Sequence, residues 1–170
     1  SVVRYGNVID SRGSVIPLFR KMINEKSNFL PVTDKRMTRF FLTLKDSVKF
    51  VVKSFSLMNK GEVFVPKMYS LKIEDLALSL KPGIKIKIIG LRPGEKIDEL
   101  LCSNEENQNT LEFKDHYTIF RNNEEALKYN KLLKGQRRGK KVSKSFYYSS
   151  LNNSRLLKIK DIVKIFPNLI

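Results

Sequence analysis

Short apolar runs typical of β-strands alternate along this chain with longer segments of helical periodicity, and this alternation limits the folds open to it. Helical spacing is clearest over residues 43–58, where large apolar side chains recur on one face: Leu44, Val48, Val51, Val52 and Phe55. The pattern favours an α/β fold. The strands are few and short for a self-contained doubly wound sheet, and the first residues already read as a buried strand. We therefore expect a portion of a larger fold.

The remaining elements follow from similar patterns. Pro17 suits the first turn of a helix that buries Phe19 and Met22, and Ser70 is placed to cap a helix ending near residue 80. Further helices are expected over 96–103, 122–133 and 159–166. Extended segments are expected over 28–34, 38–43, 62–66, 84–90 and 110–120.

Composition indicates a globular protein, with 41% hydrophobic and 29% charged residues among 170. No apolar run reaches the roughly 18 to 20 residues that a transmembrane helix needs, so no membrane partner is expected. The first residues lack the apolar core of a signal peptide, and the single cysteine rules out a disulfide framework. These features predict a cytoplasmic location.

The formal net charge of +16 raises the possibility of a basic nucleic-acid-binding module. The charge is spread over helix faces, however, and its densest stretch covers only residues 133–144. A general bias of the source towards lysine, asparagine and isoleucine explains the charge equally well. Nucleic-acid binding therefore stays open as an alternative, ranked below the interpretation developed next.

Several common sites are missing from the sequence. There is no glycine-rich dinucleotide loop and no P-loop, and one histidine with one cysteine cannot build a zinc site. No metal site is expected. His116 reads as an ordinary half-exposed histidine, and Cys102 as a buried, inert thiol on a helix.

What remains is a set of arginines in loops at the ends of elements: Arg12, Arg36, Arg39 and Arg92. The guanidinium group presents a planar fork of donors that suits phosphate oxygens, and glycine beside it lets the backbone approach a ligand. Gly13 and Ser14 precede a helix start, where free N–H groups favour an anion. Taken alone, each arginine is better explained as a solvated or salt-bridged surface residue.

Four blocks of sequence resemble, in order and spacing, the polysaccharide-biosynthesis family of extended short-chain dehydrogenases. They are "VVRYGNVIDSRGSVIPLFRKMI", "VTDKRMTRFFLTLKDSVKFV", "GEVFVPKMYSLKIEDLA" and "IKIIGLRPGEKIDELL". Within that family the sequence most resembles the inverting UDP-N-acetylglucosamine 4,6-dehydratases. The resemblance covers nearly the whole chain but only the second half of the family's length. It implies the C-terminal, substrate-binding portion of a Rossmann-type fold whose N-terminal dinucleotide-binding half is absent.

The resemblance also implies a reaction. In the full enzymes NADP (or NAD) takes a hydride from the sugar C4, water is eliminated across C5 and C6, and the hydride returns to C6 with inversion at C5. The catalytic Tyr-x-x-x-Lys pair belongs to the family's first half, and no tyrosine here has lysine four residues on. We therefore assign no catalytic residue to this chain and expect it to be inactive alone.

By similarity, Asn7 would contact the substrate and Val8 the cofactor. Arg12, Gly13 and Ser14 would wrap the nucleotide sugar, while Arg39 and Arg92 would clamp its diphosphate. Glu95 would bind the ribose or orient Arg92, and Asp10 stands where the family usually has glycine.

The chain is treated as one nucleotide-sugar-binding portion over 1–170, with residues 135–170 forming a basic segment and last helix of the same domain. The expected ligand is UDP-N-acetylglucosamine or a related UDP-sugar. A separate N-terminal Rossmann chain is the expected partner, with a homo-oligomer for the assembled enzyme. A fragment of a UDP-hexose 4-epimerase, which shares the phosphate clamp, stays open as an alternative.

Overall fold

A computed structural model describes residues 1–133, 135 and 138–167 of the chain. Lys134, Gln136 and Arg137 of the basic stretch lie outside the described residues, as do positions 168–170. The architecture is mixed α/β, which confirms that part of the sequence-based prediction. The chain forms two compact units, each assembled from three separate segments. The prediction of a single substrate-binding portion over the whole chain stays a prediction.

Unit 2 comprises Gly6–Thr43, Met68–Glu99 and Ser150–Ile170. Its main sheet has the strand order β13-β6-β4-β2, in which β4 and β6 are antiparallel and the outer pairs are parallel. A second, two-stranded sheet pairs β3 with β7 in parallel. The strands are β2 Asn7–Val8, β3 Phe29–Val32, β4 Thr38–Leu42, β6 Tyr69–Lys72, β7 Lys85–Ile88 and β13 Leu156–Leu157.

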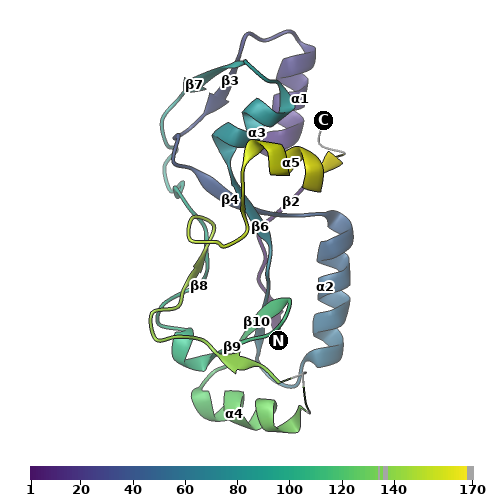
Figure 1. Ribbon diagram of the computed structural model, residues 1–170, viewed down its shortest axis with the longest axis vertical. Helices are drawn as coiled ribbons and strands as arrows, with labels where there is room; N and C mark the ends of the chain where they lie inside the picture. Colours follow the sequence, from purple (N-terminus) through teal and green to yellow (C-terminus); the bar gives the residue numbers. More distant parts are fainter. Residues whose placement is uncertain (134, 136–137, 168–170) are drawn as a thin grey trace. The chain divides into compact units, whose positions relative to one another are not determined.

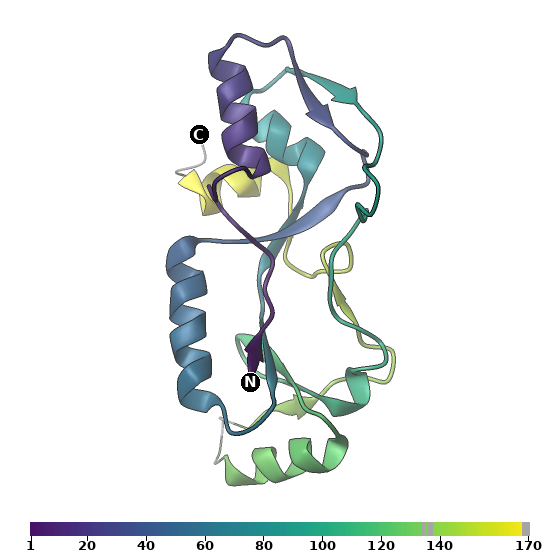
Figure 2. The same cartoon turned by 180° about the vertical axis from the view of Figure 1, so that it is seen from behind.

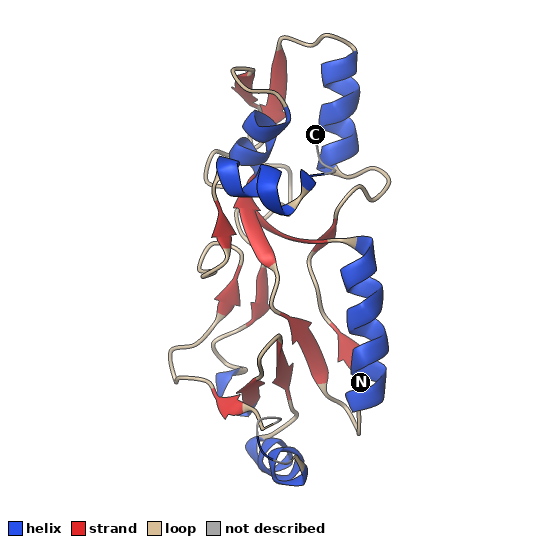
Figure 3. Ribbon diagram, turned by 45° about the vertical axis from the view of Figure 1, so that its right-hand side comes forward, coloured by secondary structure: helices blue, strands red, loops and turns tan. Residues whose placement is uncertain are grey.

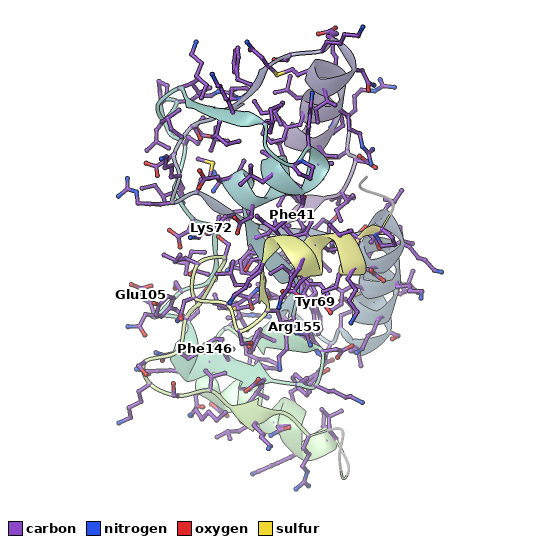
Figure 4. The ribbon with its side chains drawn as sticks, turned by 45° about the horizontal axis from the view of Figure 1, so that its top comes forward. Phe41, Tyr69, Lys72, Glu105, Phe146 and Arg155 are labelled. Atoms are coloured by element: carbon purple, nitrogen blue, oxygen red, sulfur yellow. The ribbon has the colours of Figure 1, made fainter. Side chains whose placement is uncertain are left out.

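Three helices cover the core of unit 2: α1 Val15–Asn24, α3 Ile73–Leu80 and α5 Ile159–Ile165. Helix α3 lies between the other two, as Figures 1 and 2 both show. Phe19 of α1 and Leu76 of α3 are fully buried in the same apolar cluster as Phe41 of β4. On the outside of this unit the guanidinium of Arg155 lies over the ring of Tyr69, 5.7 Å from its centroid (Figure 4).

Unit 1 comprises Ser1–Tyr5, Leu44–Lys67 and Leu100–Ser149. Its five-stranded sheet has the order β1-β5-β10-β9-β11, parallel only between β1 and β5. A short antiparallel pair joins β8 to β12. The elements are β1 Val2–Val3, α2 Leu44–Leu57, β5 Val63–Pro66, β8 Leu100–Cys102, a 3-10 turn Asn107–Asn109, β9 Thr110–Glu112, β10 His116–Ile119, α4 Asn123–Leu132, β11 Lys140–Lys141 and β12 Tyr148–Ser149.

Two local predictions are wrong. The helix expected over 96–103 is instead strand β8, whose Cys102 pairs with Tyr148 of β12. Leu100 is exposed, whereas Leu101 and Cys102 are both buried. Ser70 does not cap α3, because it lies within strand β6 and Lys72 occupies the capping position.

His116 is also buried rather than half-exposed. Its ring stacks on Phe113 at a centroid separation of 4.6 Å, and its Nδ1 lies 2.9 Å from Asp115 Oδ1. Burial lowers the pKa of the imidazole below its usual value, partly offset by the hydrogen bond to Asp115. This environment favours the neutral ring.

Cys102 is buried, as predicted, although it lies on a strand rather than on a helix. Burial, reinforced by the charge of Glu106, raises the pKa of its thiol to about 12. Because the thiolate is the reactive form, this thiol is inert at neutral pH.

Candidate functional site

A cavity of about 280 Å³ opens within unit 2, between the start of α1 and the loop that follows β7. Its wall combines apolar side chains with a smaller set of polar and charged side chains. Phe41, labelled in Figure 4, forms part of the wall from β4. The lining residues are Asn7, Gly13, Ser14, Val15, Leu18, Phe19, Pro31, Val32, Thr33, Met37, Arg39, Phe41, Ile73, Ile89, Arg92 and Glu95.

The amino end of α1 forms one edge of this cavity. Gly13 has φ +75°, a left-handed conformation that favours glycine, and turns the chain into the helix. Ser14 precedes the helix in extended conformation, but its side chain makes no capping hydrogen bond. Its Oγ is buried and has no partner among the described residues. The helix start therefore presents a hydroxyl and first-turn N–H groups with spare hydrogen-bonding capacity.

Asp10 precedes this edge and has φ +60°, the region that glycine adopts most readily. This conformation accounts for the glycine that the resemblance places here. The carboxylate of Asp10 accepts a 2.8 Å hydrogen bond from Arg20 of α1, which offsets its negative charge. Arg12 is exposed and does not line the cavity.

Arg39 lies on β4 and is largely buried, with a side-chain exposure of 15%. Its Nη1 donates to the carbonyls of Thr38 at 2.7 Å and Ile97 at 3.1 Å, and its Nη2 donates to Lys96 O at 2.6 Å. The guanidinium thus ties the loop before β8 to β4. Two carboxylates form long ion pairs with this guanidinium. Glu95 Oε1 lies 4.0 Å from Nη2, and Glu99 Oε1 lies 3.9 Å from Nε.

Arg92 and Glu95 belong to one closed turn in the loop after β7. Glu95 N donates to Arg92 O at 3.0 Å, and Arg92 N donates to Glu95 Oε2 at 3.1 Å. Gly94, with φ +77°, makes this turn possible. The side chain of Arg92 has no hydrogen bond or ion pair within the part of the chain that the structure describes, so its whole donor fork is available to a ligand.

Asn7 is anchored from two directions. Its Nδ2 donates to Phe40 O at 3.1 Å and to Glu99 Oε1 at 2.9 Å, while its Oδ1 has no partner among the described residues. Glu99 accepts from Phe40 N through its other oxygen at 2.8 Å. Glu99 N in turn donates to Ser150 Oγ, which lies 2.8 Å from Thr38 Oγ1. This network holds β2, β4 and the loop in one arrangement.

Glu99 is the residue that sequence reasoning missed. The signal available was its spacing: it lies four residues after Glu95, in the same block that suggested Arg92. Only the fold shows that its carboxylate serves Phe40 and Asn7, which are distant in sequence.

Six of the eight binding residues predicted from the sequence line the one cavity: Asn7, Gly13, Ser14, Arg39, Arg92 and Glu95. Val8 lies in β2 beside them, paired with Leu42 of β4, but does not line the cavity, and neither does Arg12. The roles of all eight stay predictions. No cluster of three or more histidine, cysteine, aspartate or glutamate side chains suited to a metal ion occurs among the described residues.

The family follows from sequence comparison. A family model described as "Polysaccharide biosynthesis protein" matches residues 1–121, which include every residue of the proposed site. The chain belongs to the polysaccharide biosynthesis protein family. This confirms the resemblance read from the four sequence blocks.

Curated relatives make the relationship more specific. The chain is 45% identical over 169 residues to a UDP-N-acetylglucosamine 4,6-dehydratase (inverting) of Campylobacter jejuni, covering 96% of this chain and 50% of the relative. It is 41% identical to a UDP-glucose 4-epimerase of Rickettsia rickettsii, covering 91% of this chain and 46% of that enzyme. The chain is thus a relative of nucleotide-sugar dehydratases and epimerases, and it spans about half their length.

A solved structure supports the same relationship. The structure of Pen from Bacillus thuringiensis superimposes with a TM-score of 0.76 at 32% identity, covering 98% of this chain and 48% of that one. No helix in the described part of the chain is long and apolar enough to cross a membrane.

Proposed function

We propose that this chain is the UDP-sugar-binding portion of a nucleotide-sugar dehydratase of the UDP-N-acetylglucosamine 4,6-dehydratase type. The observation that carries the proposal is the convergence of six predicted binding residues on one cavity. They come from β2, the start of α1, β4 and the loop after β7, four segments far apart in sequence. An unrelated set of surface arginines and glycines would not meet at one site.

The polar end of the cavity suits a diphosphate. Arg92 offers a complete guanidinium fork, which matches phosphate oxygens in a bidentate manner. The start of α1 adds N–H groups and the partial positive charge of the helix terminus. Arg39 contributes charge from a fixed position, because three backbone carbonyls already hold its guanidinium. Arg92 is therefore the arm of the clamp with all its donors available, and Arg39 is the fixed arm.

Neutral groups at the same cavity suit the sugar and the nucleoside. Asn7 Oδ1 and Ser14 Oγ are unoccupied hydrogen-bonding atoms that hydroxyl groups could satisfy. The apolar wall near Leu18 and Ile89 offers a surface for a flat ring. The cavity volume of about 280 Å³ is close to the lower end of the range of roughly 300–1,000 Å³ for ligand pockets.

The chemical steps are assigned to a Rossmann-type half that this chain does not contain. In this proposal, the described residues form the C-terminal portion of that extended short-chain dehydrogenase fold. The proposed location of the assembled enzyme is the cytoplasm. NADP (or NAD) would supply hydride transfer when bound to the assembled enzyme. Val8, beside Asn7 in β2, is the residue of this chain that the proposal assigns to contact with the cofactor.

A UDP-hexose 4-epimerase is the second candidate, favoured by the 41% identity to the epimerase of Rickettsia rickettsii. Both classes need the nucleotide diphosphate held in the same way. The cavity described here therefore predicts UDP binding for either class, and the sugar preference separates them.

Isothermal titration calorimetry with UDP, UDP-N-acetylglucosamine and UDP-glucose tests the proposal. The chain should bind UDP. Arg92→Ala should weaken binding by about tenfold to a hundredfold, corresponding to the roughly 1.5–3 kcal/mol of a charge-assisted hydrogen bond. Tighter binding of UDP-N-acetylglucosamine than of UDP-glucose supports a dehydratase, and the reverse order supports an epimerase.

Arg36→Ala is the matched control. Arg36 is an exposed arginine of the same unit, held by Asp34 through two side-chain hydrogen bonds, and it does not line the cavity. Its loss removes the same charge and should leave UDP affinity unchanged. Equal effects of both substitutions, or no UDP binding together with strongly salt-dependent binding of DNA, would refute the proposal in favour of the nucleic-acid alternative.

A further inference from the structure

Helix α2 carries its main apolar face on the outside of unit 1. Five large apolar side chains that share this face are exposed: Leu44, Val48, Val51, Val52 and Phe55. The exposed fraction is 72% for Phe55 and 65% for Val52, whereas Ser54 is only 3% exposed. The sequence predicts the opposite, because a helix in a globular protein normally turns its apolar stripe to the core.

The helix is nevertheless firmly placed within its own unit. Its inner face consists of Ser47, Phe50 and Ser54. Phe50 meets the ring of His116 edge-on at 6.0 Å, and Lys53 donates to Asp115 Oδ1 at 2.7 Å. Because successive residues of a helix are about 100° apart, these inner contacts fix the exposed stripe on an adjoining face. The stripe is therefore a stable surface of the unit, defined here as the α2 face.

A second open feature lies in the same unit, near helix α2. Strand β1 ends the five-stranded sheet and, among the described residues, pairs only with β5, in parallel. Its Val2 is exposed. Figures 2 and 3 show β1 next to α2. Parallel sheets are normally covered on both faces and continued at their edges, so this side of the unit suits further α/β structure.

We infer that the α2 face is the docking surface for the half of the family's fold that this chain does not span. The occupant is an α/β domain with a complementary apolar face. Three observations support it: the exposed stripe, the open parallel edge at β1, and relatives about twice as long as this chain. The stripe lies within the region that the family model matches.

Charge argues against a second copy of this chain as the occupant. Lys45 and Lys49 are exposed on α2 and flank the stripe, so two α2 faces packed together would bring like charges close. The net charge of +16 adds a general repulsion between copies. A different domain that does not carry these lysines avoids this electrostatic repulsion.

Co-expression tests the inference. The tagged full chain is expressed with the half of the Campylobacter jejuni dehydratase that it does not match, and the co-purified fraction is measured. The two halves of that dehydratase, co-expressed in the same way, show whether the probe half folds. We expect the wild-type chain to capture the probe, and Val52→Asp and Phe55→Asp each to reduce capture at least tenfold, as expected for central apolar contacts.

Lys49→Asp is the matched control on the same helix, and it should retain capture because its side chain lies beside the stripe. Circular dichroism checks that each variant keeps its helix content. Undiminished capture by Phe55→Asp would overturn the inference, as would absence of capture when the dehydratase's own halves associate. A wild-type dimer that Phe55→Asp converts to a monomer would show a second copy to be the occupant. This inference rests on family membership and exposure, so it and the UDP titration can fail separately.

Discussion

At the scale of single residues, the structure separates the two arginines that sequence reasoning treated alike. The guanidinium of Arg39 donates three hydrogen bonds to backbone carbonyls, while the side chain of Arg92 makes no hydrogen bond within the described residues. A buried arginine held by carbonyls is fixed in position, and an exposed arginine on a closed turn has its donors available to a ligand. Glu99 belongs to the same structural network, because its carboxylate accepts hydrogen bonds from Phe40 N and Asn7 Nδ2.

This hydrogen-bond network predicts that Glu99 contributes more to stability than Glu95 does. Glu99→Ala should lower the free energy of unfolding by about 2 kcal/mol, because hydrogen bonds to a carboxylate contribute roughly 1.5–3 kcal/mol and the Phe40 N–H loses its partner. Glu95→Ala removes an exposed hydrogen bond within the turn at Arg92 and a long, 4.0 Å ion pair with Arg39, and it should cost less than about 1 kcal/mol. Urea denaturation measures the free energy of unfolding of both variants. An equal loss in the two variants would contradict a structural role for Glu99.

At the scale of elements, a histidine joins α2 to the sheet of unit 1. His116 begins β10 and packs against Phe50 of α2, Phe64 of β5 and Phe113. Burial of the ring explains why alternation along residues 110–120 predicted a strand correctly but gave the wrong exposure for this position. The neighbours that bury it come from segments remote in sequence.

This contact makes stability depend on pH near neutrality. Burial lowers the pKa of His116 below its unfolded value, so the unfolded chain takes up a proton first. Stability is then fully present above the unfolded pKa of roughly 6.5 and falls as the pH decreases through it. Urea midpoints at pH 8 and pH 5.5 measure the loss. His116→Phe should reduce it, since His116 is the single histidine of the chain; an unchanged pH dependence in this variant would assign it to other groups.

Element identity also shows where local patterns mislead. Residues 96–103 have helical spacing of apolar side chains, yet β8 forms there because Cys102 and Leu100 pair with residues about fifty positions later. Backbone pairing across such a separation leaves no trace in a local window.

At the scale of the whole molecule, the chain carries the proposed binding residues but no Tyr-x-x-x-Lys pair. We therefore expect no dehydratase activity from the chain alone. Incubation with NADP+ and UDP-N-acetylglucosamine should yield no 4-keto product, and addition of the co-expressed dehydratase half should restore it. Turnover by the isolated chain would show that a catalytic group had been overlooked.

The sequence by itself determined the α/β class, most helices and strands, and the family, because periodicity, turn residues and motif spacing are local properties of the chain. It also identified the arginines, the glycine turn before α1 and Glu95. The tertiary structure alone decided that six of these residues share one cavity, that Glu99 and carbonyl oxygens hold Arg39, and that the apolar side of α2 faces outward. Each of these depends on contacts between segments far apart in sequence, whose energies no local pattern records.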